Sequence, residues 1–261
     1  MLFHFELLPV RDISPWGEGR GPHSWYALTL GWYWWRVGDT ELFRYSDAFL
    51  EKHGMAPPHT PTRPYDDYQL ARPWEDLLVR LPAILNPVPD DIAAKLMSGS
   101  AWINKILDDP SAGDIGDEMR EVATRWWLER TWDAMYLKDP PRIWLWTDAE
   151  GVHIRWDNGN QLRDGVPMWD AEAGEVVMPA EAFVREVVSF DARLLRAMEA
   201  RIATIPQDLA PGVRVDVEAL SRDQEYRRGL LSGWLAQKEQ VNWDDVREAL
   251  NFMTRPGGLA S

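Results

Sequence analysis

Two groups of side chains combine charge with aromatic surface, a combination that can hold a ligand by stacking and ion pairing. The first group is expected on one face of a β-hairpin, where Trp144, Trp146, His153 and Arg155 project from two paired strands. Flat indoles between cationic groups suit a planar, sugar-like or peptide ligand. The alternative is a cation–π ladder that a helix covers, which stabilises the sheet and binds nothing.

The second group lies on a helix predicted to begin near residue 70. Arg72 and Glu75 fall roughly opposite a stripe of leucines, so the helix presents an arginine flanked by acids. The alternative is an exposed intrahelical ion pair, which contributes only about 0.3–0.5 kcal/mol. The predicted ligand-binding residues are Trp144, Trp146, His153, Arg155, Arg72 and Glu75.

No reaction has a comparable signature in this sequence. Adjacent acids recur, as in Asp90-Asp91 and Asp244-Asp245, but capping and the helix dipole already favour acids at helix starts. An acid/base pair needs two carboxyls that face each other across a cleft, which spacing in sequence cannot show. GxSxG, P-loop and GxGxxG motifs are absent. Catalytic residues are therefore left unassigned.

The histidine and cysteine content argues against a metal or a cofactor. The five histidines are scattered and show neither HExxH nor i, i+4 spacing, so no metal site is expected. The absence of cysteine excludes disulfides, thiolate zinc sites, iron–sulfur clusters and a thiol nucleophile. No cofactor is expected.

The charge balance restricts the kind of partner. The 261 residues contain 42 Asp and Glu against 28 Lys and Arg, a formal net charge of −14. This charge repels phosphate backbones and anionic lipids, so neither nucleic acid nor a membrane is an expected partner. A protein, above all a basic one, or a small molecule is expected instead. The alternative is that the surplus carboxylates only solvate the surface.

The sequence also favours a cytoplasmic location. The N-terminus carries neither a basic leader nor a small-residue cleavage site. The longest uncharged apolar run, 24–35, is shorter than the roughly 20 residues that a membrane helix needs.

The elements that must position these residues indicate an α+β protein. Alternation at 2–8 and short β-like runs at 25–30, 32–37 and 41–45 predict an N-terminal antiparallel meander. The best hairpin spans about 142–157, with Trp146 opposite His153 and Trp144 opposite Arg155. Helical spacing or capping predicts helices at 70–85, 90–97, 101–107, 114–137, 179–205, 216–235 and 242–250.

Sixteen tryptophans are expected to form mainly the core, because each buries a large apolar area. Trp126, Trp127 and Trp132 point in different directions around one predicted helix, so that helix should be buried. We expect one domain over 1–261, in which a small sheet is packed by several helices. A sub-division near 52–65, where prolines cluster at 57–64, is the alternative.

Several motifs are shared with a known family. They are Pro15-Trp16-Gly17, the aromatic run at 25–34, the segments at 41–45 and 71–78, Gly165–Trp169 and Pro179–Phe183. By these motifs the sequence resembles an actinobacterial family of unknown function over nearly the whole chain. The resemblance implies a single unit and a cytoplasmic bacterial protein, and it assigns no catalytic residue.

The leading hypothesis is a non-enzymatic acidic binding protein, of which an immunity-like protein is one form. A second hypothesis is a hydrolase or transferase with a carboxylate pair in a cleft between the sheet and the helices. A third is a structural subunit of a homo-oligomer. The sequence does not choose an oligomeric state.

Overall fold

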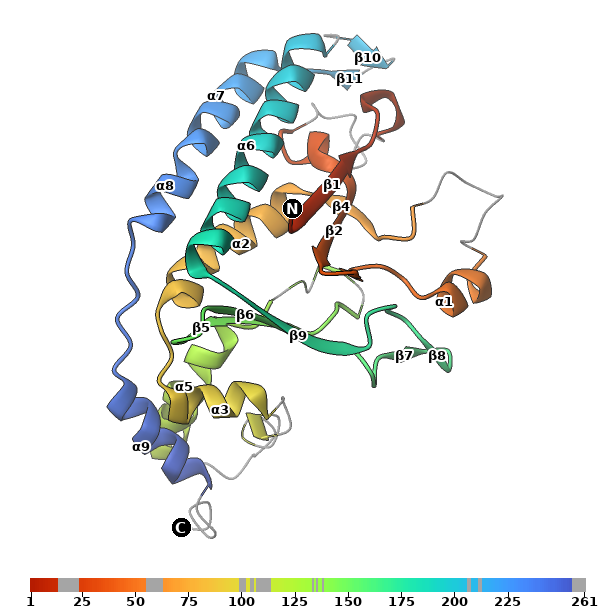
Figure 1. The fold of residues 1–261 in the computed structure, drawn as a ribbon. Helices are drawn as coiled ribbons and strands as arrows, with labels where there is room; N and C mark the ends of the chain where they lie inside the picture. Colours follow the sequence, from red (N-terminus) through yellow and green to blue (C-terminus); the bar gives the residue numbers. More distant parts are fainter. Residues whose placement is uncertain are drawn as a thin grey trace.

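Two small antiparallel sheets lie at the centre of the protein, with helices packed around them (Figure 1). This computed structural model describes residues 1–13, 24–54, 63–98, 102–103, 106, 114–132, 134, 136–137, 139–205, 208–210 and 213–254. The arrangement confirms the predicted α+β class. The prolines at 57, 58 and 61 and most of the helix predicted at 101–107 lie outside the described residues.

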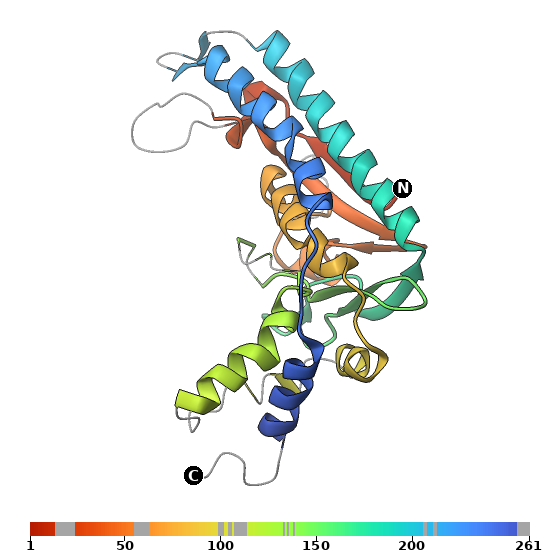
Figure 2. The same ribbon diagram turned by 90° about the vertical axis from the view of Figure 1, so that its left-hand side faces the viewer.

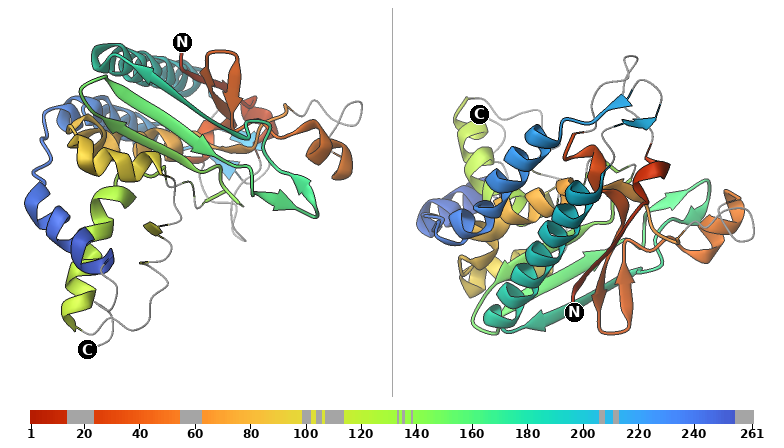
Figure 3. Two further views of the ribbon diagram at one scale, coloured as in Figure 1. Left: turned by 60° about the horizontal axis from the view of Figure 1, so that its bottom comes forward. Right: turned by 90° about the horizontal axis from the view of Figure 1, so that it is seen from above.

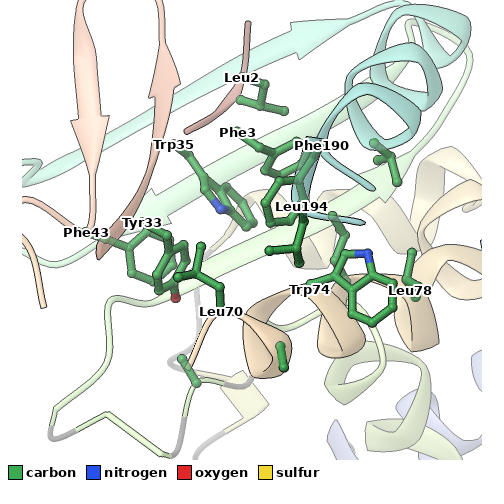
Figure 4. Close-up of a cluster of buried hydrophobic side chains, with 14 of the residues drawn as sticks. Leu2, Phe3, Tyr33, Trp35, Phe43, Leu70, Trp74, Leu78, Phe190 and Leu194 are labelled. Atoms are coloured by element: carbon green, nitrogen blue, oxygen red, sulfur yellow. The ribbon is translucent and has the colours of Figure 1, made fainter. Parts of the chain in front are cut away.

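Strand β2 is the centre of the N-terminal sheet. β1 pairs along one edge of β2, while β3 and β4 share its other edge, β3 near Trp35 and β4 near Leu30. Side chains on one face, such as Phe3 and Trp35, enter the core and meet Phe190 (Figure 4). The strands are β1 (Phe3–Leu7), β2 (Leu30–Val37), β3 (Thr40–Leu42) and β4 (Asp67–Gln69).

The predicted meander is partly wrong at its start. Residues expected as a strand at 25–30 form the 3₁₀ turn η2 (Ala27–Thr29), in which the Thr29 hydroxyl donates to the Tyr26 carbonyl. Local side-chain hydrogen bonds of this kind compete with strand pairing. Gly31 is not a turn between two strands but lies inside β2, where the backbone of β1 approaches closely.

The second sheet has the order β5-β6-β9 and all its pairs are antiparallel. The predicted hairpin and its register are confirmed, with Trp146 opposite His153 and Trp144 opposite Arg155. The strands are β5 (Ile143–Thr147), β6 (Val152–Asp157) and β9 (Ala173–Met178), and a separate short hairpin is formed by β7 (Leu162–Arg163) and β8 (Val166–Pro167).

The helices form an upper and a lower group (Figures 1 and 2). The upper group is α2 (Ala71–Leu85), α6 (Ala180–Thr204), α7 (Val217–Arg228) and α8 (Leu230–Leu235), with α6 next to β1 (Figure 3). The lower group is α3 (Asp90–Met97), α5 (Asp114–Leu128) and α9 (Trp243–Thr254). The remaining elements of the described ranges are two short helices, η1 (Val10–Asp12) and α1 (Asp47–Lys52), and two short strands, β10 (Asp208–Ala210) and β11 (Val213–Arg214). None of the helices in the described ranges is long and apolar enough to span a bilayer.

Two predicted helices end earlier than expected. The helix predicted to reach residue 137 stops at Leu128, because the next residues pair with β5: the Trp132 N–H donates to Ile143 and the Leu145 N–H donates to Arg130. The helix predicted over 216–235 is divided into α7 and α8 at Gly229. The early end of α5 decides the geometry of the site described below.

Alternating side chains of β5 enter two different hydrophobic cores. Ile143 and Leu145 belong to the main core, with the N-terminal sheet, α2 and α6. Trp144 and Trp146 belong to a second core built from α3, α5 and α9. The β5-β6-β9 sheet is therefore buried on both sides at β5, and most of the tryptophans in the described ranges are buried.

The close approach at Gly31 gives a direct test of the strand assignment. A Cβ at this position would overlap the Glu6 carbonyl oxygen and lie 2.8 Å from the Leu7 Cα. Gly31→Ala should therefore lower the free energy of unfolding by about 1–3 kcal/mol. Gly233→Ala, on a helix with no atom within 4 Å of the added Cβ, should instead raise it by about 0.5–1 kcal/mol. Chemical denaturation measures both, and equal effects would contradict the β1–β2 contact.

Candidate functional site

A fully buried arginine follows the C-terminal end of α5. The side chain of Arg130 is 0% exposed, and its Nη1 donates to the Trp126 carbonyl at 2.8 Å, which satisfies an orphan acceptor of the helix end. Its Nη2 lies 3.0 Å from Glu239 Oε2, and its guanidinium stands 5.4 Å from the ring centre of Trp243. A buried guanidinium needs such partners, because leaving a buried charge unpaired costs several kcal/mol by an order-of-magnitude estimate, about 3–5.

Glu239 reaches this arginine from the extended segment 237–242, which links α8 to α9 along the outside of the molecule (Figures 1 and 2). The Asn86 amide, just after α2, also donates to Glu239 at 3.5 Å. Arg130 and Glu239 therefore join the end of α5, the end of α2 and the α8–α9 link.

Glu129 precedes Arg130, and when its carboxyl is protonated it can donate a hydrogen bond to Glu239. Burial, then that hydrogen bond and the charge of Glu239, raise the pKa of Glu129 to about 7, although Arg130 acts in the opposite direction. The carbonyl end of α5 also disfavours a negative charge at this position. Near neutral pH the Glu129 carboxyl is consequently protonated for about half of the time.

The acid pair borders a groove between α5 and the start of α9, two helices that lie side by side (Figure 2). The groove has a volume of about 530 Å³, and its floor includes Trp126 and Val246. Arg125 lines it too and pairs with Glu121. The five carboxyl groups that line it are Glu118, Glu121, Glu129, Glu239 and Asp245. The groove is thus strongly acidic.

On its other side the acid pair borders a second hollow of about 370 Å³ beside α2 and the end of α8. Arg80 and Lys238 lie there, so this hollow is less acidic than the groove. Nowhere in the described ranges do three or more Asp, Glu or His side chains form a group that could hold a metal ion.

The structure brings the four predicted hairpin residues together on one face. Trp144 and Trp146 are 2% and 0% exposed and pack under α3, α5 and α9. Trp146 stacks on His153 at 4.6 Å, and Arg155 pairs with Glu175 at 3.1 Å. The two indoles are therefore covered by helices, whereas the Arg155 side chain stays 28% exposed. A ligand role for the four residues stays a prediction.

His153 is held between two carboxylates. Its Nδ1 lies 2.6 Å from Glu175 and its Nε2 lies 2.8 Å from Asp148. Burial alone would raise the pKa of Asp148, but hydrogen bonds from His153 and from the backbone of Glu150 and Gly151 bring it below its usual value. His153, Asp148 and Glu175 together join the turn between β5 and β6 to strand β9.

Arg72 and Glu75 lie elsewhere, beside Tyr26 and α7. The Arg72 guanidinium is 5.3 Å from the Tyr26 ring centre, and the Tyr26 hydroxyl donates to Glu75 at 2.6 Å. Glu75 also pairs with Arg227 at 3.2 Å. Glu75 thus joins α2 to α7, and the six predicted residues do not form a single site.

The sequence analysis missed Glu129 and Glu239. They are separated by 110 positions, and neither belongs to a motif or an adjacent acid pair. The position of Glu129 just after the end of α5 is the one feature that could have drawn attention to it. The sequence analysis predicted a helix to residue 137 and therefore placed Glu129 inside that helix.

The fold and site define an acidic α+β protein with a carboxyl pair beside a buried arginine. Residues 2–249 match the model of the family of unknown function DUF5984, so the chain belongs to that family, and the predicted resemblance to a family of unknown function over nearly the whole chain is confirmed. No curated protein and no solved structure matches the chain.

The raised pKa of Glu129 predicts a specific pH dependence of stability. A carboxyl whose folded-state pKa exceeds its unfolded value of about 4.5 stabilises the fold fully below pH 4.5, and this contribution is lost as the pH rises through about 7. Because Glu129 is partly exposed, we expect a loss of about 1–2 kcal/mol rather than the full value. Glu129→Gln should abolish that loss in denaturation curves recorded from about pH 4.5 to 8.

The matched control is Glu181→Gln, an exposed acid on α6. Its stability should follow the wild-type curve in parallel across the same pH range. If the Glu129→Gln curve also runs parallel to wild type, the pKa of Glu129 is not raised in the folded protein.

Proposed function

We propose that this protein is a non-enzymatic binding protein whose acidic groove between α5 and α9 holds a basic segment of a partner protein. The observation that supports this most is the convergence of five carboxyl groups on a groove with one lining arginine, which is already paired. An ammonium or guanidinium group of the partner would replace the proton on Glu129.

The energetics favour this exchange at neutral pH. Since the pKa of Glu129 is about 7, removing its proton there costs little. A cation placed about 4 Å from one carboxylate gains about 4 kcal/mol of Coulomb energy at an effective dielectric constant of ~20, before desolvation is subtracted. Val122, which is 38% exposed, offers apolar surface for the stem of a lysine or arginine.

The length of the groove sets the length of the segment. Glu118 to Glu129 covers 11 helical steps, or about 16 Å at 1.5 Å per residue. An extended chain rises about 3.3 Å per residue, so about five residues would lie along the groove. The net charge of −14 would steer such a segment toward the protein at long range. An immunity-like role in an actinobacterial cytoplasm is one form of this proposal, and the net charge of −14 and the lack of a catalytic motif in the sequence favour it.

A penta-arginine peptide with a fluorescent label tests the proposal by anisotropy at about 0.15 M salt, where long-range attraction is screened beyond about 8 Å. The groove variant combines Glu118→Gln, Glu121→Gln and Asp245→Asn. It should bind at least about tenfold more weakly than wild type, a change of about 1.4 kcal/mol.

The control variant removes three exposed acids from α6 and α7, Glu181→Gln, Glu218→Gln and Glu225→Gln. It changes the net charge by the same amount, so non-specific attraction falls equally in both variants. The control should bind within about twofold of wild type. Equal weakening of the two variants would show that the peptide responds to net charge and not to the groove.

The raised pKa of Glu129 also favours a second candidate, a hydrolase or transferase. A carboxyl that is partly protonated near neutral pH, placed beside a second carboxyl, can act in general acid and base catalysis. In that case Glu129→Gln and Glu239→Gln would each abolish turnover of a substrate, while the affinity for penta-arginine would not fall to the same extent. The binding protein remains the proposal, because the groove gathers five carboxyl groups and its one lining arginine is already paired.

A further inference from the structure

A third hollow, of about 790 Å³, lies beside the start of β5 and shares no lining residue with the acidic groove. The segment before β5, the end of α5 and the first residue of β7 surround it. Its character is aromatic and not acidic, so it offers a binding site beyond the proposed function.

Three indoles line this hollow, those of Trp127, Trp132 and Trp144. Each is buried, and the rings of Trp127 and Trp144 are 5.7 Å apart with their planes inclined at 56°. Because the three rings come from α5, the following segment and β5, their positions are fixed by both cores. Such walls suit a flat aromatic ligand.

Three buried polar atoms at this hollow have no hydrogen-bond partner within the described ranges. One is the indole N–H of Trp132. The other two are the indole N–H of Trp144, whose residue is 2% exposed, and the Gln161 side-chain oxygen. The Gln161 amide nitrogen donates to the Pro140 carbonyl at 2.7 Å, which fixes the orientation of the amide. A buried polar group without a partner costs about 1–3 kcal/mol. A ligand with one acceptor for the Trp144 N–H and one donor for the Gln161 oxygen would remove this cost at both atoms.

The charge at the hollow favours an anion. Asp139 lines it but pairs with Arg163 at 3.7 Å, so its charge is partly offset. Arg142 also lines it and is exposed, and its guanidinium forms no ion pair in the part of the chain that the structure describes. Arginine binds carboxylates in a planar, two-pronged geometry.

We propose that this hollow binds a small aromatic carboxylate that carries a ring N–H or hydroxyl group. The ring packs against the indoles and the carboxylate pairs with Arg142, with the Trp144 N–H donating to an oxygen of the ligand. The ligand's own donor reaches Gln161. The site is independent of the acidic groove, so either can fail without the other.

The test uses the full chain and indole-3-acetate as the probe, with binding measured by calorimetry and by the shift of the Trp144 indole N–H resonance. Binding with a Kd below about 1 mM is expected. Tryptamine, in which an ammonium replaces the carboxylate, should bind at least about tenfold more weakly. 1-Naphthaleneacetate, which lacks the ring N–H, should also bind at least about tenfold more weakly than indole-3-acetate.

Three variants separate the contacts. Trp144→Phe keeps a ring but removes the N–H, Arg142→Gln removes the charge, and each should weaken binding about tenfold. Trp146→Phe is the matched control, because it removes an equally buried indole N–H without a partner from the same strand, away from the hollow. It should change binding by less than about twofold.

Three results would overturn the proposal: no binding at about 5 mM probe, tryptamine binding as well as indole-3-acetate, or Trp146→Phe weakening binding as much as Trp144→Phe. Thermal unfolding of each variant establishes that it is folded before binding is compared.

Discussion

The need to satisfy one buried guanidinium decides where the two helical groups meet. Arg130 has no access to solvent, and removing such a charge from water is costly unless hydrogen bonds and an opposite charge replace the water. The Trp126 carbonyl and Glu239 provide them, with the Asn86 carbonyl at 3.4 Å. The α8–α9 link must therefore pass the end of α5, and this brings Glu239 to Glu129.

The same constraint explains why the acidic groove exists. Glu239 is held by Arg130, so α9 begins beside α5 and packs along it. Asp91 on α3 and Arg247 on α9 form a two-pronged pair, at 2.7 and 3.0 Å, which holds α9 from another side. The second core lies between these helices and β5. The acids of α5 and α9 that do not enter this core, Glu118, Glu121 and Asp245, line the groove.

Much of the fold could be predicted because local signals agreed with the tertiary structure. The β5–β6 register followed from sorting apolar pairs to one face, and β5 in the structure obeys it because its two faces enter two cores. The strand expected at 25–30 was wrong, since the Thr29 hydroxyl and the Ser24 carbonyl stabilise a 3₁₀ turn that period-2 alternation cannot reveal. Gly31 indicated a turn, whereas its role is a contact with β1.

The candidate site could not be predicted for a different physical reason. The acid pair depends on the chain leaving α5 at Leu128 to pair with β5, and this long-range pairing leaves no periodic trace in sequence. The predicted Trp144 and Trp146 do share a face, yet only the packing of α3, α5 and α9 determines that helices cover them. Arg72 and Glu75 both contact Tyr26, and Glu75 also pairs with Arg227, so their partners come from distant parts of the chain.

The central claim, that Arg130 holds Glu239 beside Glu129 and that this neighbour raises the pKa of Glu129, can be measured directly. In a ¹³C NMR titration of the full chain, the side-chain carboxyl carbon of Glu129 should titrate with a pKa of about 7, and Glu239→Gln should bring that pKa down toward its ordinary value. A wild-type pKa of Glu129 near the unfolded value of 4.5, unchanged by Glu239→Gln, would contradict the account.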